Sequence, residues 1–183
     1  MRKLALTIAI AFGSALTMGS PLSAKNPMVG GAAMYPNRNI VQNAINSKDH
    51  TTLVAAVKAA GLVDTLAGPG PFTVFAPTNG AFANLPPGTV ETLVKPESKA
   101  TLTKILTYHV VPGRITAQQI AAMAAKHGGT ATLKTVEGEN LSFRKSGGGW
   151  QVIDAKGGSA RITIPNVMQS NGVIHVVDTV LMP

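Results

Sequence analysis

The sequence lacks cysteine altogether and has few aromatic residues, with one Trp, two Tyr and five Phe among 183 residues. The absence of cysteine excludes a disulfide framework, a thiolate nucleophile and thiolate ligands for a metal ion. Proteins that bind single-stranded nucleic acid interleave aromatic rings with basic side chains on a sheet. Phe143, Arg144 and Trp150 give only a thin version of that pattern, so we expect no nucleic-acid partner.

The sequence also lacks a hydrophobic run long enough to cross a membrane, which takes about 20 residues in a helix. Its apolar stretch over residues 4–18 follows Arg2 and Lys3 and leads to the small-residue sequence SPLSA. This arrangement is typical of a secretory signal peptide. We expect cleavage after Ala24, which removes residues 1–24 and leaves a secreted, periplasmic or cell-surface protein without a transmembrane span. Retention of the segment as an uncleaved anchor is the alternative.

Acidic side chains are scarce, with 8 Asp and Glu against 16 Lys and Arg. Without Arg2 and Lys3 the mature chain keeps a formal charge of +6. In an exported protein, a basic surface favours contact with anionic polysaccharide, lipid headgroups or acidic proteins. The basic residues are scattered, however, and a scattered pattern also fits a role in solubility alone. We expect a partner that is a protein or an anionic polysaccharide of the envelope or matrix.

The mature chain has the length of one domain and can bury a core without covalent cross-links. Residues 25–38 are rich in Gly, Pro and Ala and show no periodicity, which predicts a flexible lead-in. Residues 39–183 contain no internal repeat. We therefore expect a single domain over residues 39–183, and a monomer.

Helical patterns come mostly early in this domain and strand patterns late. Residues 49–61 form an amphipathic pattern with Asp49 placed to cap it and Gly61 placed to end it. Thr116 and Gln119 have the spacing of a capping box. Further helical pieces lie within residues 86–113 and 116–129, and strands are predicted at 71–77, 130–136, 141–145, 150–154, 160–164 and 172–178. This segregation predicts the α+β class, a sheet with helices packed along it.

The four histidines show no spacing typical of a metal site, and no HExxH motif occurs. His50 and His127 lie at polar helix ends, where we expect them to be solvated. His175 interrupts an apolar strand and is expected to be half-buried with a satisfied hydrogen bond. An enzyme remains the alternative, either a hydrolase or a metal-dependent enzyme, if His109, His175 and Asp178 converge in space.

Other signatures of catalysis are missing. The chain contains no G-x-S-x-G nucleophile elbow, and the glycine-rich stretches SGGGW and AKGGSA join strands and so predict hairpin loops. We expect no metal ion and no cofactor. The sequence NLS at Asn140 matches the acceptor pattern for N-glycosylation, which matters only in a host that glycosylates.

Three stretches taken together resemble the fasciclin domain family. TVFAPTNGAFANLP is similar to its first signature block, LTYHVVPG to its central Tyr-His segment, and SNGVIHVVDTVLMP to its C-terminal block, all in the family's order. The resemblance implies a wedge with a β-sandwich-like core and helices packed along it, a role in adhesion or matrix contact, no enzyme activity and no cofactor. It also implies candidate binding residues at Tyr108, His109 and the strand from His175 to Leu181.

The first block is predicted to be scaffold. Thr78 or Asn79 is placed to cap the helix that follows, and Phe82 returns a ring to the core. Together with Asp178 of the C-terminal block, we assign these residues to the structural motif. Gly80 stands where the family more often has a side chain, which weakens the start of the helix by up to about 1 kcal/mol. The leading hypothesis is an exported adhesion or matrix-binding module, and a purely structural envelope protein is a further alternative.

Overall fold

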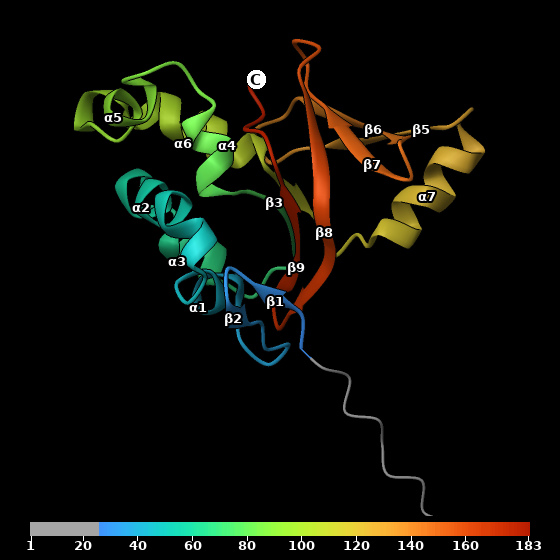
Figure 1. Cartoon of the computed structure of the whole chain (residues 1–183), viewed down its shortest axis with the longest axis horizontal. Coiled ribbons are helices and arrows are strands. Elements are labelled where there is room, and N and C mark those ends of the chain that lie inside the picture. Colours follow the sequence, from blue (N-terminus) through green and yellow to red (C-terminus); the bar gives the residue numbers. More distant parts are fainter. Residues whose placement is uncertain (1–25) are drawn as a thin grey trace, which may run out of the picture.

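The computed structural model describes residues 26–183, so the predicted signal peptide and its cleavage site lie outside the described residues. The described part of the chain has the predicted α+β class. Seven strands form one sheet in the order β4-β3-β9-β8-β7-β6-β5, and Figure 1 shows it between a group of helices on one side and the helix α7 on the other. The strands are β3 Phe72–Pro77, β4 Val110–Pro112, β5 Thr130–Lys134, β6 Asn140–Ser146, β7 Gly149–Ile153, β8 Ser159–Gln169 and β9 Gly172–Val177.

Most of the helices lie on one side of the sheet, at the left of Figure 1, while α7 lies on the other side with β5 to β7. The capping box predicted at Thr116 and Gln119 is confirmed at the start of α7. The helices are α1 Ile40–Ala44, α2 Thr51–Ala60, α3 Val63–Ala67, α4 Asn79–Ala83, α5 Thr89–Leu93, α6 Lys99–Tyr108 and α7 Ala117–Lys126, with 3-10 turns η1 Lys48–His50 and η2 Pro96–Ser98.

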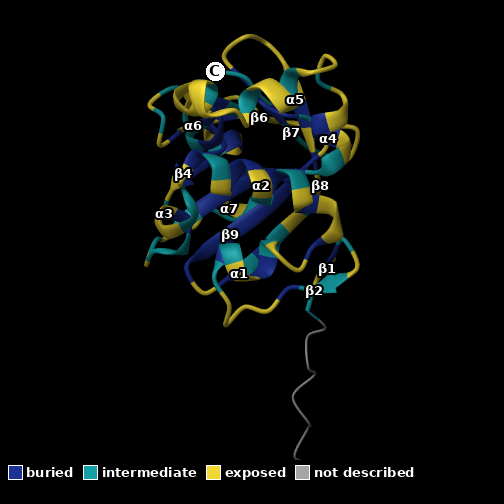
Figure 2. Ribbon diagram, turned by 90° about the vertical axis from the view of Figure 1, so that its left-hand side faces the viewer, coloured by how far each residue is buried: buried dark blue, intermediate teal, exposed yellow. Residues whose placement is uncertain are grey.

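Two hydrophobic clusters hold these layers together. Leu53, Leu106 and Ile174 belong to the first, which lies between the early helices and the strands β3, β9 and β8. Phe143 and Ile120 belong to the second, which lies between α7, β5 to β8 and the other face of the central strands. The central strand β9 is buried along its whole length, as the dark blue ribbon behind the helices in Figure 2 shows.

The sheet curls until its two edges approach each other. At one edge, β4 follows α6, and the N–H of Val136, just after β5, donates to the carbonyl of Val110 in β4 at 2.8 Å. The long strand β8 bends between Ile162 and Val167, where its pairing with β9 shifts register twice. Asn166 in this bend has a positive φ of 58°. The bend carries β8 from the central strands to the outer hairpins, as β-bulges commonly do.

The prediction of a flexible lead-in over residues 25–38 is wrong for residues 28–34. Met28–Val29 and Ala32–Ala33 pair as the short hairpin β1–β2, and Val29 and Met34 are buried in the helical cluster. Two glycines make the turn, with φ of 58° at Gly30 and 75° at Gly31. Absence of periodicity was a poor guide here because strands of two residues are too short to show a period.

The start of α2 also differs from the prediction. Asp49 does not cap the helix; it lies in η1, and the helix begins at Thr51 with no side-chain bond from its own N-cap residue. The N–H of Thr52 instead bonds to Oδ1 of Asn79 at 3.0 Å. A distant residue therefore supplies the acceptor that a local cap would provide. Gly61 ends the helix in the left-handed region, as predicted.

Candidate functional site

Tyr108 and His109 stand where α6 ends and β4 begins. Leu102, Ile105 and Leu106 bury one face of α6, and this fixes the direction in which the next two side chains leave the helix. His109 is the C-cap residue, and the chain then enters β4, which lies beside β3. Both side chains point into the molecule, with exposed fractions of 0% for Tyr108 and 2% for His109.

His109 joins the end of α6 to the C-terminal segment. Its Nε2 accepts the N–H of Leu181 at 3.0 Å, so the neutral ring carries its proton on Nδ1, which donates to the carbonyl of Ile105 at 2.8 Å. Burial lowers the pKa of His109 to about 4, against smaller opposing effects of the Ile105 carbonyl and the Asp154 carboxylate. The ring is therefore neutral at physiological pH, with both nitrogens engaged.

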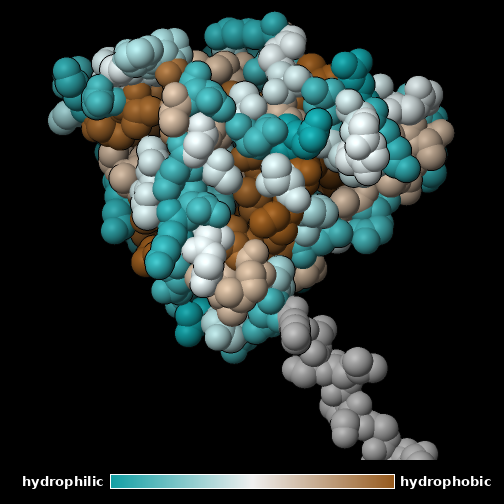
Figure 3. Space-filling view, viewed as in Figure 1, coloured by the Kyte–Doolittle hydropathy of each residue, from teal (hydrophilic) through white to brown (hydrophobic). Residues whose placement is uncertain are grey.

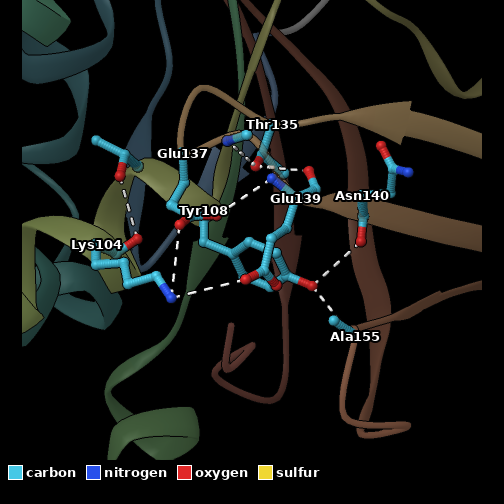
Figure 4. A network of polar contacts seen from close by, with 9 residues as sticks. Lys104, Tyr108, Thr135, Glu137, Glu139, Asn140 and Ala155 are labelled. Carbon is cyan, nitrogen blue, oxygen red and sulfur yellow. Dashed lines mark hydrogen bonds and ion pairs between the residues drawn. The ribbon is translucent and has the colours of Figure 1, made fainter.

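Tyr108 ties two hairpins to the helix. Its hydroxyl donates to the carbonyl of Asn140 at 3.2 Å and accepts the N–H of Ala155 at 2.8 Å, as drawn in Figure 4. Burial raises the pKa of Tyr108, partly offset by the Ala155 N–H and reinforced by nearby carboxylates. Lys104, one helical turn earlier, lies 3.6 Å from carboxylate oxygens of both Glu137 and Glu139. The phenol therefore stays protonated and serves as a fixed link.

His175 lies in the middle of β9 and is fully buried, where the sequence predicted half-burial. Its Nδ1 accepts the N–H of Asn166 at 3.3 Å, and its Nε2 donates to the carbonyl of Ile115 at 2.9 Å. The ring stacks on Phe75, with centroids 5.4 Å apart. Burial lowers the pKa of His175, with a smaller opposing effect of Ile115. His175 thus joins β9 to the bend of β8 and to the segment before α7.

Asp178 is exposed, and its carboxylate accepts the backbone N–H of Arg161 at 2.8 Å and the hydroxyl of Thr179 at 3.1 Å. No hydrogen bond among the described residues joins any two of His109, His175 and Asp178, and each has its own backbone partner. Within residues 26–183 no three His, Asp or Glu side chains are grouped to hold a metal ion. The geometry does not assemble these three residues into one reacting site.

The first signature block connects β3 to the helical layer. Thr78 caps α4 through its hydroxyl, which accepts the N–H of Ala81 at 3.2 Å, and the ring of Phe82 is buried. Besides binding Thr52, the amide of Asn79 donates to the carbonyl of Lys48 at 2.8 Å and to the hydroxyl of Thr51 at 2.9 Å. Asn79 therefore fixes the start of α2 against α4.

A cavity of about 50 Å³ lies beneath α1, α2 and α3, and most of the residues that line it are aliphatic. His50 lines it and is 3% exposed, so its predicted solvation is wrong. The 3-10 turn that precedes α2 rotates the ring inward, where Nδ1 lies 2.9 Å from the hydroxyl of Ser47. Burial lowers the pKa of His50. Ser47 is itself 1% exposed, so this Ser-His pair lies out of reach of a dissolved substrate. His127 is exposed, as predicted.

One polar surface was overlooked in the sequence. Along β5 to β8 one set of alternate residues is buried in the second cluster, and the other set faces away from it. We call this second set the outer face; its hydroxyl and amide residues surround three basic ones. It consists of Thr130, Thr132, Lys134, Asn140, Ser142, Arg144, Ser146, Gly149, Gln151, Ile153, Ser159, Arg161 and Thr163. The sequence signal of this face is the alternation of polar with apolar residues, which marks the outward side chains of each strand.

Comparison with known proteins gives a family match over most of the chain. The profile of the Fasciclin domain matches residues 48–183. Protein sll1483 of Synechocystis sp. is 47% identical over 159 residues, which cover 87% of this chain and 81% of that protein. The cell surface glycolipoprotein MPB83 of Mycobacterium bovis is 34% identical over 174 residues, covering 88% of this chain and 68% of that protein.

Two further comparisons agree with this match. The immunogenic protein MPB70 of Mycobacterium bovis is 32% identical and covers 90% of this chain and 86% of its own length. Among solved structures, a FAS1 domain pair from the insect cell adhesion molecule fasciclin I superposes with a TM-score of 0.72 at 20% identity. The match covers 81% of this chain and 52% of that one, so this chain spans about half of the solved pair. At this identity the likeness shows the fold alone.

Proposed function

Because the chain belongs to the fasciclin domain family, we propose that it is an exported, non-enzymatic adhesion or matrix-binding module at the cell surface. Its partner in this proposal is a protein or a polysaccharide of the envelope or matrix. Relatives of the family include proteins named as cell surface glycolipoproteins, and no helix within residues 26–183 is long and apolar enough to cross a bilayer.

The observation that carries this proposal is that the polar side chains of the signature blocks are hydrogen-bonded to the backbone of the protein itself. Each ring nitrogen of His109 and His175 bonds to a backbone group. One of the His109 bonds stays within α6, to Ile105, whereas the others, and both bonds of the Tyr108 hydroxyl, reach other segments. A catalytic base or nucleophile needs a free atom within reach of a substrate. These groups support a rigid scaffold, and a rigid scaffold suits recognition by an exposed surface.

Two experiments test the proposal. Fractionation of cells that make the full chain, with N-terminal sequencing of the product, locates it and identifies its first residue. We expect a product outside the cytoplasm that begins at or near Lys25. An intact product confined to the cytoplasm would contradict the exported role.

The binding role is tested with the purified protein coupled to beads and incubated with envelope extract. Beads that carry the same protein after heat denaturation provide the control, because they expose the same residues without the fold. We expect selective retention of an envelope protein or polysaccharide by the native beads. Equal retention by both kinds of bead, or none by either, would leave a purely structural envelope role as the better account.

A further inference from the structure

We propose that the outer face of β5 to β8 binds a linear anionic polysaccharide, one that carries carboxylate or sulfate groups along its chain. This inference rests on the proposed binding function and assigns it a surface and a partner class. The surface is separate from Tyr108, His109 and His175, which are buried.

The register of the strands sets a row of side chains on this face. Thr130 of β5 pairs with Arg144 of β6, Arg144 pairs with Gln151 of β7, and Gln151 pairs with Arg161 of β8. Side chains of paired residues point to the same face of a sheet. The two arginines therefore lie two strand spacings apart, about 10 Å. Both are exposed.

The charge of this face has one sign. Strands β5 to β8 contain no Asp or Glu, while the outer face carries Lys134, Arg144 and Arg161. The ion pairs found among the described residues are those of Lys104, so neither arginine is neutralised by one. Asp178, which follows β9, lies beside β8, and its carboxylate accepts the backbone N–H of Arg161. A planar guanidinium binds carboxylate and sulfate oxygens through paired hydrogen bonds.

The rest of the face suits a hydroxylated chain. Hydroxyl and amide side chains lie between and around the basic residues, and Gln151 already donates to Ser159 at 2.8 Å. In Figure 3, the surface over β5 to β7 at the upper right shows teal and white residues, with tan ones at the right-hand margin. An extended polysaccharide that lies across the strands would place its acidic groups against the arginines and its hydroxyls against Thr130 and Gln151.

Two other occupants fit less well. The outer face has no aromatic ring, since Phe143 is fully buried and Trp150 packs against the second cluster. Single-stranded nucleic acid relies on such rings for stacking. A peptide docking on a sheet usually adds a strand at an edge, whereas this row runs across the middle of four paired strands. Charge and hydrogen bonding must therefore supply the affinity, which makes it sensitive to salt.

The test measures binding of the purified protein to immobilised alginate, a linear polyuronate, with dextran as the neutral control. The test variant is R144Q/R161Q, which removes two positive charges and keeps hydrogen-bonding side chains. The matched control is K95Q/K99Q, which removes the same charge from two exposed lysines on the helical side of the molecule. Melting of each variant checks that the fold is retained.

We expect the parent to bind alginate and not dextran, with affinity that falls as salt is raised. R144Q/R161Q should bind alginate about tenfold more weakly, and K95Q/K99Q should bind it nearly as well as the parent. Equal weakening in both variants would mean that net charge alone is responsible and would overturn the assignment of the face. Tighter binding to poly-L-glutamate than to alginate would replace the polysaccharide with an acidic protein.

The alginate experiment can contradict the polysaccharide inference without contradicting the proposed binding function. A parent that binds no alginate but retains an envelope protein on beads would overturn this inference and leave the binding role in place. A parent that binds alginate through Arg144 and Arg161 supports the inference, and retention of the same polymer class from envelope extract supports both.

Discussion

Protonation of His109 should destabilise the folded protein as the pH falls from 7 to 5. The neutral ring accepts the N–H of Leu181 on Nε2 and donates to Ile105 from Nδ1. A second proton would occupy Nε2, remove the acceptor for Leu181 and place a charge in an apolar environment. The variant His109→Gln removes this titration and keeps a polar side chain in the same place.

The pKa sets both the sign and the size of the effect. The pKa of His109 is about 4 in the folded protein, below the ordinary histidine value of 6.5. The unfolded chain therefore binds more protons in this range, and stability falls as the pH falls. The contribution is fully present above pH 6.5 and is lost as the pH falls through 4. For these two pKa values the loss is about 2 kcal/mol between pH 7 and 5, and about 3 kcal/mol by pH 4.

The assay is urea unfolding of the parent and of His109→Gln at several pH values from 7 to 5. At pH 7 the variant should be less stable by about 1 to 3 kcal/mol, because a buried backbone group loses its partner. As the pH falls to 5, the difference in free energy of unfolding should shift by about 2 kcal/mol in favour of the variant. His50 and His175 also have lowered pKa values and titrate in both proteins, so they cancel in the difference. Two curves that stay parallel would refute the assignment of His109 as a neutral buried link.

Three further outcomes are expected from unfolding or melting experiments on single variants. Gly80→Ala should raise the free energy of unfolding by up to about 1 kcal/mol, because alanine favours the helix more than glycine does and the added Cβ meets only the hydroxyl of Thr78, at 3.7 Å. Unchanged melting would show that α4 contributes little to stability. Asn79→Ala should lower the free energy of unfolding, measured in urea, by about 2 kcal/mol, since three hydrogen bonds to η1 and the start of α2 are lost. A loss below about 0.5 kcal/mol, the effect of a neutral surface change, would contradict the role of Asn79 as a distant cap. Gly172→Ala should prevent soluble expression or lower the melting temperature strongly, because the added Cβ would overlap the carbonyl of Phe72 in the paired strand. A melting temperature like that of the parent would show that β3 and β9 can shift to accommodate the Cβ.

The sequence predicted the elements whose signals are local. The capping box of α7, the glycine stop of α2 and the apolar strand β3 depend on residues within one turn or one strand, and all three are present. The order of the signature blocks also identified the family, since three spaced matches are far more specific than one. The fold class followed from both.

What the sequence did not predict depends on contacts between distant segments. The acceptor for Thr52 comes from Asn79, and the burial of His50 follows from a 3-10 turn that no periodicity marks. In the hairpin β1–β2, Val29 packs in a cluster with helices that come later in the chain. The depth of His175 could not be read from alternation, because a strand covered on both faces has no polar side.

The site residues divide in the same way. The sequence singled out Tyr108 and His109, which lie at the end of α6, but their partners Asn140, Ala155 and Leu181 lie more than 30 residues away. The outer face needs strand register, which the sequence does not specify by itself. Only the pairing of β6, β7 and β8 brings Arg144 and Arg161 into one row.

The position of β9 in the sheet has a consequence for the order in which the chain can fold. This strand, Gly172–Val177, lies between β3 and β8, and its parallel pairing with β3 joins residues 100 positions apart. A ribosome delivers the chain from its N-terminus, so β3 and the helices emerge long before their central neighbour. Contacts this distant in sequence form slowly, because a long loop must close first. The sheet is therefore completed only after synthesis of residue 177, and until then the apolar edge of β3 must be kept from pairing with other chains.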